Sequence, residues 1–196
     1  MSDFPYAGIS GINPTDRWED LRFPAAGINP PGAVADPTVN TTNGLLEFAA
    51  AATNTIAFQV QLPHAWEEGS ELHAHVHWRK KTQGTGKVYW RLTYEFQNPA
   101  GTFTDTPATL NATTVVDATP DDGTALVHLI TSLGTVDMAG KKISCMGMCT
   151  LSRIGGDNAD DYAGVAQLLE VDFHYKVDSF GSVYEWIKQN TAGVAP

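Results

Sequence analysis

The chain has 196 residues, a length that can bury a full hydrophobic core within one domain, and its formal net charge is −10. This acidic excess excludes nucleic acids and anionic membrane surfaces as partners, because both require a basic face on the protein. Only 17% of the residues are charged, and Thr, Gly, Ala and Asn are abundant instead. This composition is typical of an all-β protein. No apolar run reaches the length of a membrane-spanning helix, and the first ten residues lack the basic and apolar parts of a secretory signal, so we expect synthesis in the cytoplasm.

Residues 1–43 are predicted to form an extended N-terminal arm. They contain six of the 11 prolines and show neither the period of a strand nor that of a helix. Their apolar side chains are too numerous to be left in water, so the arm either wraps its own domain or lies across a neighbouring subunit. The side chains expected to bind a partner are those of Phe4, Tyr6, Trp18, Leu21 and Phe23.

Residues 44–196 are predicted to form an antiparallel β-sandwich, jelly-roll-like, with about eight strands. Alternating apolar residues are separated by clusters of Gly, Pro, Asn and Asp. In 87–97 and 171–178 the alternation is strict, which gives each strand one buried face. The turn at 83–86 predicts a hairpin between the strands 71–80 and 87–97. The predicted strands are 45–49, 55–62, 71–80, 87–97, 109–117, 125–132, 142–153 and 167–178.

A short helix is predicted near residues 183–189. Ser182 and Glu185 have the spacing of a capping box, and the apolar residues that follow share one helical face. The two cysteines, Cys145 and Cys149, lie four residues apart on one predicted strand, roughly 13 Å from each other and too far apart for a disulfide. We therefore expect both to be reduced core residues.

Three histidines, His73, His75 and His77, alternate along the predicted strand 71–80 and so share its solvent face. Neighbouring imidazoles in such a row lie roughly 6.6 Å apart, and two of them can chelate Zn²⁺ if a third ligand comes from elsewhere. The spacing from Gly69 also fits the first part of the cupin pattern, but the later cupin ligands are absent. A cupin metal site, a structural metal site or threefold axis, and a polar strand face all stay open. We expect the polar face, with no metal and no cofactor.

Two acidic loops are the remaining candidates for chemistry. Neither loop has the spacing of a calcium-binding EF-hand, so we expect solvated turns. Nucleophile motifs and a phosphate-binding glycine loop are absent from the sequence, and we therefore do not expect an enzyme. The loops carry Asp117, Asp121 and Asp122 in the first, and Asp157, Asn158, Asp160 and Asp161 in the second.

Two stretches of the sequence resemble structural proteins of tailed-bacteriophage virions. The first runs from Leu62-Pro63-His64 to His75-Val76-His77-Trp78 and is followed by the aromatic strand 88–95; the second is 161–175. The resemblance covers residues 60–178 and leaves out the arm. It implies a jelly-roll or related sandwich, assembly as a homotrimer, and a place on the particle as a decoration (cement), head-fibre or neck component. It supplies no catalytic residues.

We therefore expect a non-enzymatic capsid decoration protein that is made in the host cytoplasm. As a homotrimer it would bind the major capsid protein on the outside of the virion and stabilise the head. A tail, neck or head-fibre attachment protein is the alternative within this class. Two other classes stay open: a carbohydrate-binding module in which Trp66, Tyr89 or Tyr184 stacks on sugar rings, and a divergent cupin that uses His75 and His77.

Overall fold

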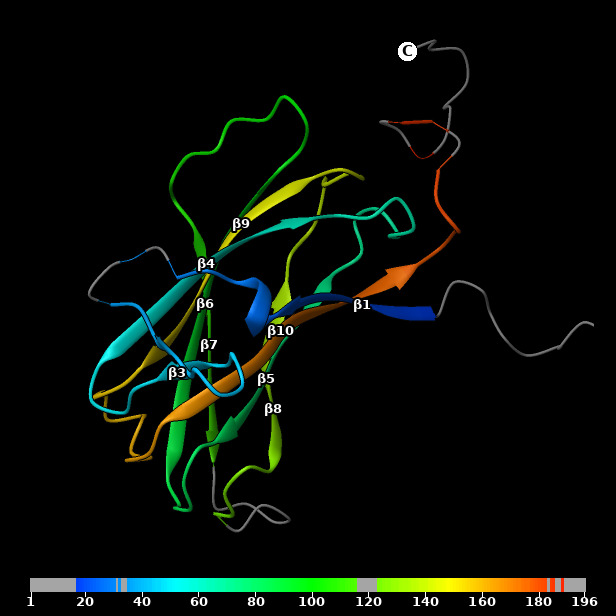
Figure 1. Cartoon of the computed structure of the whole chain (residues 1–196). Helices are drawn as coiled ribbons and strands as arrows, with labels where there is room; N and C mark the ends of the chain where they lie inside the picture. The colour runs from blue at the N-terminus through cyan, green and yellow to red at the C-terminus, as the bar shows by residue number, and fades with distance from the viewer. Residues whose placement is uncertain are drawn as a thin grey trace, which may run out of the picture.

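The computed structural model consists of two antiparallel sheets packed face to face, which confirms the predicted β-sandwich (Figure 1). It describes residues 17–30, 32, 35–115, 123–182, 184, 185 and 188. Sheet A has the order β2 (Thr38–Val39), β3 (Leu46–Phe48), β10 (Ala166–Val177), β5 (Leu72–Lys80) and β8 (His128–Val136), with β1 (Arg17–Pro24) also paired to β10. Sheet B has the order β4 (Thr53–Gln61), β9 (Met146–Ile154), β6 (Lys87–Gln97) and β7 (Ala108–Val115).

The strand pairs are nested within one another along the chain. The innermost pair is β6 with β7, and β5 with β8, β4 with β9 and β3 with β10 enclose it in turn. Each sheet receives alternate pairs, which is the arrangement produced when one long double-stranded ribbon is rolled into a sandwich. This is the strand order of a jelly roll.

The predicted hairpin between strands 71–80 and 87–97 is wrong. The first of these strands, β5, lies between β10 and β8 in sheet A, whereas β6 lies between β9 and β7 in sheet B. The glycine-containing segment at 83–86 crosses from one sheet to the other. Here the Gly84 amide donates to the Gly123 carbonyl at 2.9 Å, and Gly86 adopts a φ of 117° that favours glycine.

The core lies between the two sheets and is filled by the inward side chains of alternating strands. Three tryptophans, Trp66, Trp78 and Trp90, are completely buried. The rings of Trp78 and Trp90 meet edge to face across the sheets with centroids 6.0 Å apart. Cys145 and Cys149 are buried and free, as predicted.

Part of the predicted arm is a strand of the sandwich. Residues Arg17–Pro24 form β1, which pairs with β10 of the same chain along its whole length (Figure 1). Leu21 and Phe23 pack against the core, where the Phe23 ring lies 5.1 Å from that of Phe58. The strand forms because Leu21 and Phe23, in its second half, are apolar and face inward, and because the edge of β10 next to β3 is open. Phe4 and Tyr6 lie outside the described residues.

The predicted C-terminal helix is not seen among the described residues. Tyr184, Glu185 and Lys188 lie in bends, and the rest of 183–189 lies outside the described part of the chain. Ser182 does not cap a helix, because its hydroxyl contacts the His64 ring at 2.6 Å and the Tyr184 carbonyl at 2.5 Å. In the described parts of the structure, no helix has the length and apolar character needed to cross a membrane.

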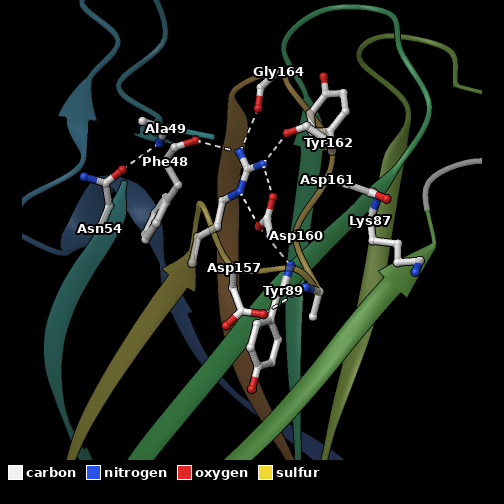
Figure 2. A network of polar contacts seen from close by, with 12 residues as sticks. Phe48, Ala49, Asn54, Lys87, Tyr89, Asp157, Asp160, Asp161, Tyr162 and Gly164 are labelled. Atoms are coloured by element: carbon white, nitrogen blue, oxygen red, sulfur yellow. Dashed lines mark hydrogen bonds and ion pairs between the residues drawn. The ribbon is translucent and has the colours of Figure 1, made fainter. Parts of the chain in front are cut away.

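A buried arginine anchors the second acidic loop to the sandwich. The guanidinium of Arg153, on β9, is fully buried and donates twice to the Asp160 carboxylate, at 2.8 and 2.7 Å. It also donates to the carbonyls of Phe48, Tyr162 and Gly164 at 3.1, 2.6 and 2.7 Å (Figure 2).

All five N–H groups of Arg153 therefore have acceptors. Asp160 also accepts from the Tyr89 amide at 3.0 Å, and only 7% of this aspartate is exposed. The prediction of a solvated turn is wrong for Asp160, because its carboxylate pairs with the buried guanidinium of Arg153. Asp157, Asn158 and Asp161 are exposed. The first acidic loop, with Asp117, Asp121 and Asp122, lies outside the described residues.

Candidate functional site

Among the described residues, titratable side chains gather on the outer face of sheet A. The gathering is built by three adjacent strands, β1, β10 and β5. The register places Asp20 opposite His174 and His174 opposite His73, and in the next row Asp172 lies opposite His75. Side chains at alternate positions of a strand share a face, so these two rows project together from the sheet. We call Asp20, His75, Asp172 and His174 the Asp172 cluster.

Asp172 is the centre of the cluster. Its side chain is only 2% exposed although it points away from the core, because imidazoles surround it. One carboxylate oxygen, Oδ1, lies 3.7 Å from His75 Nδ1 and 3.4 Å from His77 Nε2. The other, Oδ2, lies 3.1 Å from His174 Nε2, which in turn lies 3.2 Å from Asp20 Oδ1. The rings of His75 and His174 are 4.3 Å apart between centroids.

Two of the buried polar atoms in the cluster have no hydrogen-bond partner. These are Asp172 Oδ1 and His75 Nδ1. A buried carboxylate oxygen without a donor is costly, since it has lost its water and gained no hydrogen bond in return. The arrangement therefore leaves one acceptor and one ring nitrogen directed at the same small volume.

The cluster shifts the pKa values of its members. Burial, together with the neighbouring imidazoles of His174, His77 and His73, lowers the pKa of His75 to about 4. Burial raises the pKa of Asp172, while His77 and His174 act in the opposite direction. At neutral pH His75 is thus an uncharged imidazole, which is the form that coordinates metal ions.

Two sets of side chains in the described structure could hold a metal ion, and in each set the ligand atoms lie within 4.8 Å of one another. The first set is His75, Asp172 and His174, and the second is His77, Glu170 and Asp172. Both carboxylate oxygens of Glu170 are occupied, however, by Arg22 at 2.9 and 2.7 Å. His77 is also engaged, with its Nδ1 2.8 Å from His128 Nε2.

The three predicted histidines have three different surroundings. His75 belongs to the Asp172 cluster, His77 lies between Asp172 and His128, and His73 packs against the Trp18 ring at 4.8 Å. Each of the two sets of metal-ligand side chains found among the described residues contains one histidine of β5 and takes its other members from β10. All three face away from the core, which apolar side chains fill.

The residues weighed for sugar stacking are placed differently from what the sequence suggested. Trp66 forms a β-bridge with Val177 at the end of β10 and is completely buried. It therefore cannot stack on a ligand. Tyr89 is half-buried with the Arg91 guanidinium over its ring, and Tyr184 is 37% exposed.

Sequence reasoning missed Asp20, Asp172 and His174 as members of the site. Asp172 and His174 were correctly placed on the solvent face of their strand, but nothing indicated that this strand lies beside β5. The sequence feature that could have indicated the site is the spacing of polar residues on the two strands, His75-x-His77 on one and Asp172-x-His174 on the other. Only the sheet register brings the two patterns together.

A second surface feature lies where the chain joins and leaves the sandwich. Arg17 and Val177 are paired, so the start of β1 and the end of β10 are side by side. Next to them Phe180 is fully exposed and Trp18 is 44% exposed. A shallow recess of about 220 Å³ lies at the same place. Its lining residues are Arg17, Glu19, Ala65, Val177, Asp178, Ser179 and Phe180.

No known protein family matches the chain, and no curated protein matches it. Among solved structures, the insecticidal delta-endotoxin Cry8Ea1 from Bacillus thuringiensis is similar over 81% of this chain, with a TM-score of 0.43 and 10% identity. Dimeric latent PorU from Porphyromonas gingivalis is similar over 90% of this chain, with a TM-score of 0.34 and 12% identity. This chain spans only 24% and 14% of those two proteins. Likenesses this weak carry no argument about function.

Proposed function

We propose that the chain is a non-enzymatic structural protein of a tailed-bacteriophage particle, which binds the outer capsid surface as a homotrimer and stabilises the head. The observation that carries the proposal is the exposure of two aromatic side chains, Trp18 and Phe180, near the paired start of β1 and end of β10. Trp18 lies on the outer face of sheet A against His73, and Phe180 lies in the segment after β10. Exposed aromatic side chains are candidates for burial against a partner protein.

The resemblance to virion proteins supports the same proposal. The residues that carry it form β5, β6, β10 and the segments leading into them, which are central strands of a jelly roll. Jelly rolls occur in viral capsid proteins, in lectins and in cupins, so the fold alone does not choose among these functions. Of the residues weighed for sugar stacking, Trp66 is buried and cannot take that role.

A decoration protein needs binding area rather than a reaction. Each copy adds contacts at the seams of the shell, and many copies together convert modest single interfaces into large collective stability. The net charge of −10 also suits the outer surface, where the protein is not drawn to packaged DNA.

The decisive experiment measures binding of the purified chain to capsids of the phage that encodes it. We expect Phe180→Ala to weaken binding by roughly 10- to 150-fold, because burying a phenylalanine contributes about 1.5–3 kcal/mol. Its thermal midpoint should stay unchanged, since the side chain is fully exposed. Leu126→Ala is the matched control, because this leucine is 58% exposed but lies beside Lys80, at the opposite end of sheet A.

Equal binding by the wild type, Phe180→Ala and a deletion of residues 1–16 would refute the anchoring role. The deletion ends before β1 and so leaves the sandwich intact. Light scattering of the free protein tests the trimer, whose mass is three times the 21.1 kDa of one chain. Hundreds of copies on a particle indicate decoration of the shell, while about a dozen indicate the alternative position at the neck or tail.

A further inference from the structure

We propose that the Asp172 cluster is a binding site for one divalent transition-metal ion, with Zn²⁺ as the ion that best suits its ligands. His75 Nδ1, His174 Nε2 and the Asp172 carboxylate are the three core ligands, and Asp20 supplies a fourth. This inference is independent of the proposed place on a virion.

The first argument is the unsatisfied chemistry at the base of the cluster. Asp172 is 98% buried by side-chain area, and its Oδ1 has no hydrogen-bond donor. His75 Nδ1, 3.7 Å away, is buried and equally without a partner. Native proteins seldom bury such a pair without an occupant. A cation between the two atoms satisfies both, because each offers a lone pair.

The second argument is the spacing of the ligand atoms. Zinc binds histidine nitrogen and carboxylate oxygen at roughly 2.0–2.2 Å, so two ligands at a tetrahedral angle lie about 3.3–3.5 Å apart. The distances along the cluster are 3.7 Å from His75 to Asp172, 3.1 Å from Asp172 to His174, and 3.2 Å from His174 to Asp20. The first distance ends on Asp172 Oδ1 and the second on Oδ2, so one ion would contact both oxygens or would require the carboxylate to turn. The ligand atoms of His75, Asp172 and His174 lie within 4.8 Å of one another. Asp20 lies outside this set and would join it by rotation of its half-exposed side chain.

The third argument is the kind of ligand and the access to it. Two imidazoles with one or two carboxylates suit Zn²⁺ and its neighbours in the first transition row. Calcium and magnesium prefer six or more oxygen ligands, which this face does not offer. His174 and Asp20 are 39% and 53% exposed, so an ion reaches the site directly from solvent.

The overlapping set of His77, Glu170 and Asp172 is less suited to an ion. Glu170 accepts two hydrogen bonds from Arg22, and binding a metal there would require this pair to break. Its side chain is 12% exposed, and the guanidinium beside it would repel a cation. His77 is therefore assigned as a neighbour that contacts Asp172 from the other side.

An ion at the cluster would join three strands. Its ligands come from β1, β10 and β5, so it would fasten the edge strand β1 to the centre of sheet A through Asp20. The metal would thus stabilise the strand that leads to the N-terminal segment. No reaction is implied by this site.

The test is titration of the chelator-treated full-length protein with Zn²⁺, followed by calorimetry and by the thermal midpoint. We expect one Zn²⁺ per chain with a dissociation constant on the order of micromolar or tighter, and a thermal midpoint that rises with added Zn²⁺. Co²⁺ in place of Zn²⁺ should give the visible absorption of a tetrahedral site. His174→Gln and Asp172→Asn should each weaken binding by more than roughly tenfold.

His73→Gln is the matched control, because His73 lies on the same strand and face as His75 but packs on Trp18 instead of joining the cluster. If Asp172→Asn does not fold, His174→Gln at the more exposed side of the site still decides the question. The proposal is overturned if Zn²⁺ uptake does not saturate, or if His73→Gln loses as much affinity as His174→Gln. It is also overturned if His77→Gln abolishes binding while His75→Gln leaves it unchanged.

Discussion

Arg153 is the residue whose replacement should cost the fold most among its ion-paired side chains. We consider Arg153→Met, which keeps an unbranched chain in the core and removes the guanidinium. The change leaves the buried Asp160 carboxylate without its two charged donors, and it leaves three backbone carbonyls without one of their partners. The loss is therefore one of satisfied polar groups and not of packing volume.

The magnitude follows from burial. Both side chains of the Arg153–Asp160 pair are 0% exposed, and breaking such a pair by removing one partner costs about 3–5 kcal/mol. The Arg22–Glu170 pair has the same two-pronged geometry but side-chain exposures of 63% and 12%. Solvent screens that pair, so Arg22→Met should cost about 1 kcal/mol or less. The structure thus predicts a difference of roughly 3 kcal/mol between two chemically identical replacements.

Urea unfolding followed by tryptophan fluorescence measures both values, because Trp66, Trp78 and Trp90 report on the core. With a urea dependence of about 2.5 kcal/mol per M, Arg153→Met should lower the midpoint by roughly 1.5 M and Arg22→Met by less than about 0.5 M. Asp160→Asn should resemble Arg153→Met, since it leaves the buried guanidinium unpaired. Equal midpoints for Arg153→Met and Arg22→Met would refute the reasoning that burial sets the value of these pairs.

Two further predictions concern the core and its connections. Burial raises the pKa of the Cys149 thiol to about 12, so alkylation at pH 8 should be slow in the native protein and rapid in denaturant. Because the unfolded thiol ionises near its ordinary pKa of 9, the stability that depends on the neutral thiol is present below pH 9. It is lost as the pH rises toward 12, which a series of urea midpoints would detect against Cys149→Ala. Gly155→Ala should destabilise by about 1–3 kcal/mol, because a Cβ there would lie 2.5–2.8 Å from three backbone carbonyl oxygens of 49–52. Gly27→Ala, with open space around it, is the control and should not lower the thermal midpoint.

The faces of the strands could be predicted from the sequence, and their neighbours could not. In β10, Val171, Phe173, Tyr175 and Val177 are buried as the alternation required. An alternating pattern records which side chains face the core, but it carries no information about which strand lies alongside. The partners of β10 are separated from it by about ninety residues or more of chain, so local turn chemistry could not identify them. For this reason His75 was the only member of the Asp172 cluster that the sequence indicated as a possible ligand.

Other differences have local physical causes. Trp66 lies between predicted strands and was therefore weighed as an exposed residue for sugar stacking, yet it is completely buried and forms a β-bridge with Val177. Arg153 is the last residue of the predicted strand 142–153 and points into the core. The sequence does not show that a carboxylate and three backbone carbonyls there accept its hydrogen bonds. The predicted helix depended on Ser182 as its cap, and that hydroxyl is engaged by His64 instead.

The position of β10 determines when the protein can fold. This last strand lies in the middle of sheet A, between β5 on one side and β1 and β3 on the other. Until residues 166–177 are in place, β1 has no partner and β5 keeps one bare edge. The innermost ribbon of β6 and β7 and the short pair of β2 and β3 can form early, because their strands are close in the chain. We therefore expect slow folding governed by the closure of long loops, with a central strand inserted last.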